Sequence, residues 1–218
     1  MADSSYSLGV VNSGNSATAN QPDGTPVPMR LGGQGQQIVG QLHGRLAESA
    51  RRGKLFYGSN GATPSVTTVA LATTYTGLAI MNPAGSGKNV ILEKVGYSFL
   101  VAFPAASTIG LMVGYAAGGV VTKSNAASAG AATLVGSANT PAGLCLLSAT
   151  LPATPTLAMV FGAGLTGAIT TTPQNQTVVD LEGAIILPPG GFAAIYTSTV
   201  SGAASLAGSF IWTEEPSA

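Results

Sequence analysis

The stretch from residue 76 to residue 103, TGLAIMNPAGSGKNVILEKVGYSFLVAF, constrains the fold of this chain most strongly. Apolar side chains occupy positions 95, 97, 99 and 101, and positions 94, 96 and 98 hold Lys, Gly and Ser. A period of two is typical of a β-strand with one face turned to a core. The segment 82–87 contains Pro and Gly and is typical of a turn. We therefore predict two strands, Gly77–Met81 and Asn89–Val101, joined by this turn.

Similar segments follow at short intervals through the rest of the chain, separated by turns that contain Gly or Pro. The predicted strands lie near residues 66–71, 76–82, 89–102, 108–115, 131–136, 144–150, 157–162, 177–187, 191–199 and 206–213. About eight to ten short strands with little helix are typical of a β-sandwich or jelly roll. We therefore predict an all-β, jelly-roll-like β-sandwich domain over residues 55–218. Residues 116–143, rich in Ala, Gly, Ser and Thr, are expected to form a long loop with one weak strand.

The N-terminal part of the chain differs in composition from the rest. Residues 1 to about 37 are rich in Ser, Asn, Gly, Gln and Pro and contain few large apolar side chains. Such a segment cannot bury enough apolar surface to offset its own ordering entropy. We predict that residues 1–54 form an extended N-terminal arm that follows a partner surface. The segments Ser7–Val11 and Val27–Leu31 would be its apolar anchoring points.

One short helix is predicted within the arm, near residues 38–52, IVGQLHGRLAESARR. Its apolar residues recur at a spacing of four and form one narrow stripe, made of Ile38, Leu42, Leu46 and Ala50. Arg51 and Arg52 fall in the last turn, where cations interact favourably with the helix dipole. Two internal glycines lower the helix propensity, so we expect a marginal helix that needs a docking surface.

Five of the eight basic residues lie between positions 30 and 54. Residues 1–54 have a net charge of +2, against −2 for residues 55–218. Five charges without a continuous run or interleaved aromatic residues do not point to nucleic acid. We expect instead that the arm docks on protein, with a solvated helix face as the alternative interpretation. The candidate partner-binding residues are Arg30, Leu42, Arg45, Leu46, Arg51 and Arg52.

Charged residues make up only 7% of the chain and sum to zero net charge, whereas a soluble domain usually has about 25%. A chain of this kind tends to self-associate. A membrane or an assembly of covering subunits would accommodate it. The long uncharged windows are interrupted by prolines and glycines, so they do not fit membrane-spanning helices, and we predict no membrane partner. The N-terminus lacks the features of a secretory signal, so we expect synthesis in the cytoplasm without Sec-dependent export.

Motifs for nucleophilic catalysis are weak. Cys145 lies in an apolar run and is expected to be a buried, inert thiol. His43 is the single histidine, and no nucleophile motif is present to meet it. We predict that the chain is not an enzyme and binds no cofactor.

Two pairs of acidic residues complete the search for chemical sites. Asp180 and Glu182 would share one face of a strand, where we expect a structural or cation-bridging pair at a subunit contact and no metal site. Glu214 and Glu215 lie near the C-terminus and are expected to be solvated.

The clear strand segments, together with the residues before the first of them, share their pattern with a known group of proteins. These segments are GRLAESARRGKLFYGSNGAT, GLAIMNPAGSGKNVILEKVGYSFL, STIGLMVGYAAG, VVDLEGAIILPPGGFAAIYTSTV and GSFIWTEEP. On these segments the chain resembles uncharacterised virion proteins of tailed bacteriophages, over roughly residues 45–115 and 178–216.

The resemblance implies a head-associated or other accessory structural protein whose jelly-roll-like domain commonly trimerises. We therefore expect a capsid decoration (cement) protein, a homotrimer on the outside of the virion capsid whose arm docks on the major capsid protein. A tail, collar or fibre attachment component is one alternative. A carbohydrate-binding jelly-roll module, with Trp212, Tyr115 and Tyr196 as stacking faces, is another.

Overall fold

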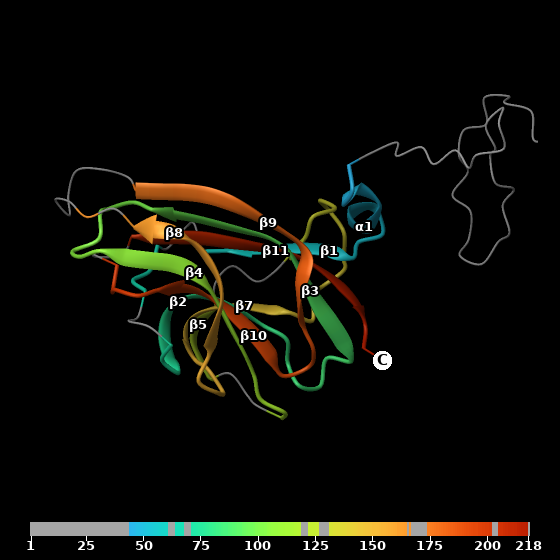
Figure 1. Cartoon of the computed structure of the whole chain (residues 1–218). Coiled ribbons are helices and arrows are strands. Elements are labelled where there is room, and N and C mark those ends of the chain that lie inside the picture. The colour runs from blue at the N-terminus through green and yellow to red at the C-terminus, as the bar shows by residue number, and fades with distance from the viewer. Residues whose placement is uncertain are drawn as a thin grey trace, which may run out of the picture. The chain divides into compact units, whose positions relative to one another are not determined.

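A computed structural model describes residues 44–60, 64–67, 71–118, 122–126, 131–164, 166, 174–201 and 205–217. Leu46–Ala218 forms one compact unit (Figure 1). Up to residue 43, the predicted arm over residues 1–54 lies outside the described residues, so its extended course stays a prediction.

The described residues contain one short helix and eleven strands (Figure 1). The helix and the first six strands are α1 Ala47–Arg51, β1 Leu55–Ser59, β2 Thr74–Met81, β3 Lys88–Phe99, β4 Ser107–Tyr115, β5 Thr122–Ala126 and β6 Ala131–Ala132. The remaining strands are β7 Leu144–Thr150, β8 Thr156–Gly164, β9 Gln174–Leu187, β10 Gly191–Thr197 and β11 Leu206–Pro216.

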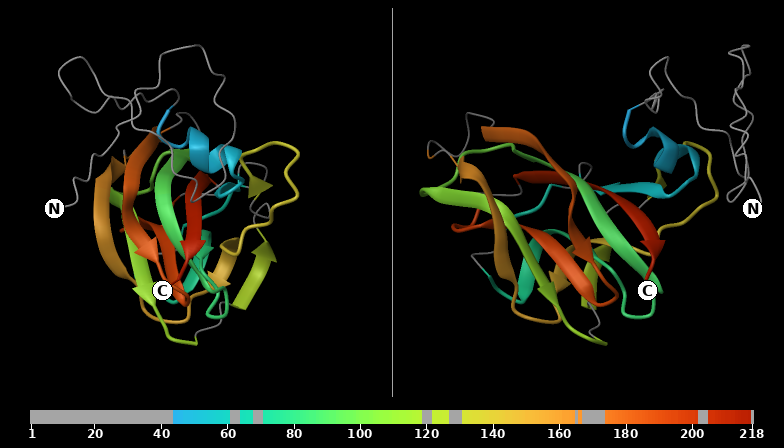
Figure 2. Two further views of the ribbon diagram at one scale, coloured as in Figure 1. Left: turned by 90° about the vertical axis from the view of Figure 1, so that its right-hand side faces the viewer. Right: turned by 45° about the vertical axis from the view of Figure 1, so that its right-hand side comes forward.

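The strands form two antiparallel sheets that pack face to face (Figure 2). The five-stranded sheet has the order β6-β1-β11-β3-β9, and the six-stranded sheet has the order β5-β7-β2-β10-β4-β8. The pairs are nested along the chain, since β4 pairs with β8, β3 with β9, β2 with β10 and β1 with β11. A long hairpin wound into two layers gives this nesting, which is the jelly-roll arrangement. The predicted jelly-roll-like β-sandwich is confirmed.

The segment between β4 and β8 forms the closed end of that long hairpin. β5 and β7 extend the six-stranded sheet beyond β2, and β6 extends the five-stranded sheet beyond β1. The loop predicted at 116–143 therefore contains two short strands, each at a sheet edge. Because β7 and β8 lie on opposite sides of β2, β10 and β4, the connection 151–155 has to cross the six-stranded sheet.

The main core lies between the two sheets. Burial alternates along β11, where Phe210 and Trp212 are fully buried and Ser209 is only partly buried. The ring centroid of Trp212 lies 6.2 Å from that of Phe56 on β1. The six-stranded sheet contributes Leu78, Ile80, Leu111 and Ile195 to the same cluster. The alternation that predicted the strands is therefore the alternation that builds the core.

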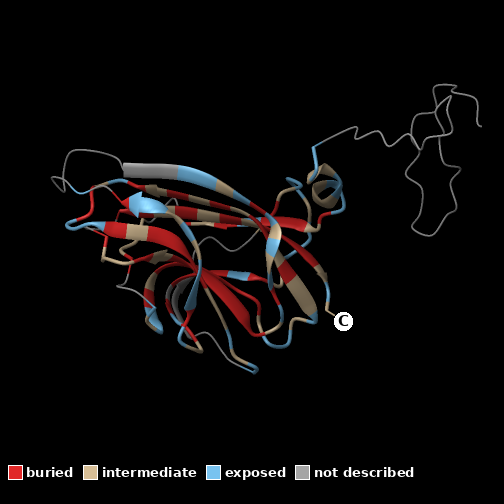
Figure 3. Ribbon diagram, in the orientation of Figure 1, coloured by how far each residue is buried: buried red, intermediate tan, exposed pale blue. Residues whose placement is uncertain are grey.

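The six-stranded sheet has a second apolar cluster on its outer face. Tyr75, Met81 and Phe192 belong to it, and they alternate along β2 and β10 with residues of the main core. Leu151, at the start of the crossing connection, packs against the same cluster. As a result β10 is buried on both faces, which explains its continuous apolar sequence (Figure 3).

Eight of the ten predicted strands are confirmed with shifts at their ends, and two need correction. The strand predicted near 66–71 is wrong for residues 66, 67 and 71, which are not in a strand, and Ser65 before them makes only an isolated bridge with Leu206. The strand predicted near 131–136 is only the two-residue β6. Conversely, β1 was not predicted, because its five residues lack the alternation: aromatic Tyr57 is exposed and Gly58 has no side chain on the buried face.

The helix is shorter than predicted. Helix α1 covers only the last part of the predicted helix near 38–52; residues 44–46 precede it, and residues 38–43 lie outside the described part. Leu46 stands at the N-cap position and makes no side-chain cap hydrogen bond. A five-residue helix with an apolar N-cap residue gains little from its own hydrogen bonds.

The two sheets approach each other closely at Gly58, and a substitution at this position tests that packing. A Cβ atom added at Gly58 would lie 2.7 Å from the Cβ atom of Cys145 on the opposite sheet. We expect Gly58→Ala to lower the free energy of unfolding in urea by about 1–3 kcal/mol, because the added methyl group overpacks the core. Gly85→Ala, in a turn with no atom within 4 Å of the added methyl group, is the matched control. Equal stability of the two variants would contradict this view of the core.

Candidate functional site

Helix α1 brings together two of the predicted partner-binding residues. Arg51 and Arg52 both reach Glu48, with nitrogen–oxygen distances of 2.9 Å and 2.7 Å. Hydrogen bonds from Arg52 and then Arg51 lower the pKa of Glu48. All three side chains remain about half exposed, so the group is a charged surface cluster. Arg45 is exposed and Leu46 is partly buried next to it in sequence.

Arg30 and Leu42, the other two predicted partner-binding residues, lie outside the described residues. Their part in partner binding therefore stays a prediction, as does that of the other four.

The chain leaves α1 through Gly53, which has a φ of +67° and so favours glycine. The side chain of Asn139 donates a hydrogen bond of 3.2 Å to the Gly53 carbonyl. Lys54 pairs with Glu215 of β11 at 3.1 Å. These contacts place α1, the start of β1, the end of β11 and the segment 133–143 at one end of the sandwich, which we call the α1 end.

Glu214 is the central side chain of the α1 end, and the prediction that it is solvated is wrong. Only 1% of its side chain is exposed. It accepts hydrogen bonds from the backbone N–H groups of Ala142 (3.1 Å) and Gly143 (2.9 Å) and from the indole N–H of Trp212 (3.1 Å). The ammonium group of Lys88 lies 3.0 Å away. Burial by itself would raise the pKa of Glu214, but these donors hold it below its ordinary value.

Residues 133–143 form a loop that is tied down at both of its ends, and we call it the pinned loop. At its start, the N–H and the hydroxyl of Thr133 both donate to the carbonyl of Leu55, at 2.9 Å and 3.1 Å. At its other end stand the two backbone hydrogen bonds to Glu214. The sequence contains one signal for this contact: Glu214 lies two positions after Trp212 on a strand, where its carboxylate can accept the indole N–H. Nothing in the sequence indicates that Ala142 and Gly143 bind the same carboxylate.

An open hollow of about 550 Å³ lies within the α1 end. Its lining residues come from the α1–β1 junction, the pinned loop and the end of β11, and include Arg52, Lys54, Asn139, Glu214 and Pro216. The α1 end carries four cations and three carboxylates, namely Arg51, Arg52, Lys54 and Lys88 with Glu48, Glu214 and Glu215. Exposed charges and an open, mixed lining suit a contact with another protein better than a small apolar ligand.

The acidic pair on β9 is predicted to share one face of a strand, and Asp180 of this pair has a basic partner on the neighbouring strand. Asp180 forms an ion pair of 2.7 Å with Lys94 on β3, and it also accepts a hydrogen bond from the backbone N–H of Glu182. Glu182 has a φ of +50° within an irregular part of the β3–β9 pairing. Asp180 and Glu182 are nevertheless both exposed, with buried Leu181 between them, so the two carboxylates lie on one face of β9, as predicted. No group of three or more His, Cys, Asp or Glu that could hold a metal ion occurs among the described residues.

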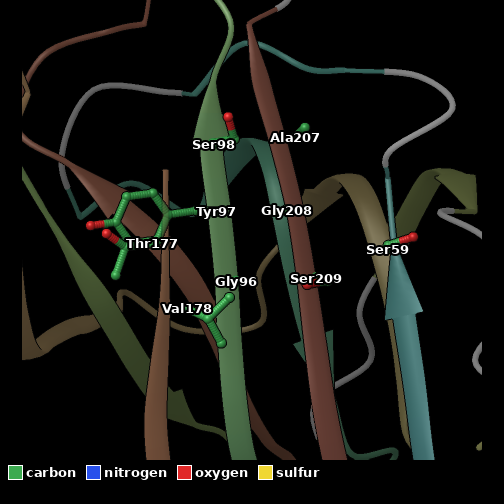
Figure 4. Close-up of a pocket in the computed structure, with 9 residues that line it drawn as sticks. All are labelled: Ser59, Gly96, Tyr97, Ser98, Thr177, Val178, Ala207, Gly208 and Ser209. Atoms are coloured by element: carbon green, nitrogen blue, oxygen red, sulfur yellow. The ribbon is translucent and has the colours of Figure 1, made fainter. Parts of the chain in front are cut away.

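A shallow trough of about 510 Å³ lies on the five-stranded sheet (Figure 4). Small residues of β3 and β11, among them Gly96 and Ser209, lie between Val178 on β9 and Ser59 on β1. Trp212 is fully buried in the core, so it offers no face for stacking on a sugar. Of the other two aromatic residues considered for carbohydrate binding, Tyr115 is exposed and Tyr196 is partly buried.

Cys145 is buried in the main core, as predicted. Burial raises the pKa of its thiol to about 12, so the thiol stays protonated at neutral pH. His43 lies outside the described residues.

Comparisons with protein-family models, curated proteins and solved structures gave no match. In the described part of the chain, no helix has the length and apolar character needed to cross a membrane.

The buried carboxylate of Glu214 predicts a dependence of stability on pH. Because the folded-state pKa lies below the ordinary value of 4.5, the ionised group stabilises the fold above that pH, and this stabilisation is lost as the pH falls through the folded-state pKa. We expect Glu214→Gln to lower the free energy of unfolding at pH 7 by about 1.5–3 kcal/mol and to weaken its decrease on acidification. Denaturant unfolding at pH 7 and at about pH 3 measures both effects.

Glu215→Gln is the matched control for this experiment, because the exposed ion pair of Glu215 with Lys54 contributes at most about 1 kcal/mol. If the two variants have the same stability and the same pH profile, Glu214 does not hold the pinned loop.

Proposed function

We propose that this chain is a structural protein of a tailed-phage virion, a capsid decoration protein that self-associates on the outer capsid. The N-terminal arm would bind the major capsid protein. The observation that carries the proposal is a low-charge jelly-roll sandwich whose α1 end is continuous with a long polar N-terminal segment.

The architecture supports a structural role. Jelly rolls of two antiparallel sheets are frequent in viral capsid proteins and in lectins. The buried carboxylate and the buried thiol each have a structural explanation in hydrogen bonding or packing.

The distribution of charge supports self-association and assembly. Charged residues are only 7% of the chain, and the described part of the surface includes several exposed apolar side chains, such as Val160, Val178 and Ile186. Neighbouring subunits that covered such surface would remove it from water.

The N-terminal segment supports docking through an arm. The segment contains too few apolar residues to offset the entropy lost on ordering, so it would become ordered only when it binds along a partner. An extended segment of this kind makes a large contact with few residues. In a trimer, three such arms would act together and raise the avidity without strong single contacts.

Deletion of residues 1–40 tests the proposal. We expect the truncated protein to keep the oligomeric state and melting temperature of the full chain, because the sandwich retains its core. We expect it to lose co-sedimentation with phage capsids that have been stripped of the protein. Light scattering and sedimentation with the encoding phage's capsids measure the two properties.

Truncated protein that still binds capsids would contradict the role of the arm. Full-length protein present in a few to tens of copies per particle, in place of hundreds, would favour the tail, collar or fibre alternative.

A further inference from the structure

The tip of the pinned loop is apolar and exposed. Val135 is 95% exposed, the highest value among the exposed large apolar residues of the described chain, and its neighbour Leu134 is 44% exposed. The N–H of Ser137 donates to the carbonyl of Leu134 at 3.0 Å, and Gly136 has a φ of +85°. These features define a tight turn that places Val135 at its outermost corner. The fold itself gains nothing from a branched apolar side chain at this corner.

The base of the pinned loop is fixed by hydrogen bonds, which restrict the position of its tip, Leu134 and Val135. Thr133 binds Leu55, Asn139 binds Gly53, and Glu214 accepts the backbone N–H groups at the end of the loop. An apolar tip on a loop with a fixed base loses little conformational freedom when it docks, and this preorganisation favours affinity.

The buried carboxylate strengthens this argument. Removing a carboxylate from water is costly, and an apolar replacement is often at least as stable. Glu214 nevertheless accepts two hydrogen bonds from the backbone N–H groups of Ala142 and Gly143 in the pinned loop. Its contribution is therefore to fix the geometry of the loop as well as to satisfy Trp212.

The tip lies at the end of the sandwich where the N-terminal segment joins. The hydrogen bonds from the pinned loop to Gly53 and Leu55 set it beside the α1–β1 junction (Figures 1 and 2). The 43 residues outside the described part join the chain at Gly44, three residues before α1 begins. A protein bound by the part of that segment nearest Gly44 would lie close to the tip.

We propose that Leu134 and Val135 form a second, apolar contact with the protein that the N-terminal arm binds. This inference rests on the proposed function. In this contact, the side chains of Leu134 and Val135 would insert into an apolar depression on the partner protein. Because the α1 end has one more cation than carboxylates, an acidic rim around that depression fits best. The arm supplies reach, and the tip fixes the orientation of the sandwich on its partner.

Full-length Val135→Asp tests the inference. A carboxylate cannot enter an apolar depression without losing its hydration, so we expect binding to stripped capsids to weaken by about tenfold or more. The change leaves folding intact, because Val135 makes no core contact; equal melting temperatures check this.

Leu100→Asp is the matched control, since Leu100 is 47% exposed just after β3 and lies outside the α1 end. It is expected to bind as the unchanged protein does. A second variant, Asn139→Ala, removes the tie to Gly53 without altering the tip and is expected to weaken binding to a smaller extent.

The outcomes separate this inference from the proposed function. If Val135→Asp binds like the unchanged protein while deletion of residues 1–40 abolishes binding, the tip contact is wrong and the proposed function stands. If Val135→Asp and Leu100→Asp weaken binding equally, the effect is not local and the inference is overturned. If the unchanged protein does not bind capsids, both proposals fall.

Discussion

The indole of Trp212 connects the core of the sandwich to the α1 end. Its rings fill the space between the sheets against Phe56, and its N–H group donates to Glu214. A tryptophan N–H in an apolar core needs a polar acceptor. Here the acceptor is the carboxylate of Glu214, which also accepts backbone hydrogen bonds from the pinned loop and forms an ion pair with Lys88. One requirement of the core thus fixes the geometry of the surface that we propose as the docking site.

The nested pairing of the jelly roll explains why these groups meet at one end. The first strand, β1, pairs with the last, β11, so the residues that follow α1 lie beside the residues that end the chain. Lys54 and Glu215 are neighbours for this reason. Any segment that precedes α1 is therefore joined to the sandwich next to β11 and the pinned loop. The topology, rather than a local motif, creates the composite surface.

Sequence reasoning succeeded where a local pattern was sufficient. The alternation on β3 and β11 and the turns around β10 carry enough information to predict the strands and the sandwich. It failed for β1, whose five residues lack the alternation, and for Glu214, whose backbone partners Ala142 and Gly143 are about 70 positions away. It also missed the register shift in the β3–β9 pairing near Glu182, because a bulge depends on the facing strand.

The sequence by itself determined the fold class, the apolar face of most strands and the contrast between a polar N-terminal segment and a low-charge domain. These properties depend on side-chain periodicity and composition, which are local. Only the tertiary structure decided that Trp212 is a core residue, that Glu214 is buried, and that Val135 stands exposed on a tied loop. Burial and hydrogen bonding between distant segments are properties of the packed chain, and no stretch of sequence contains both partners.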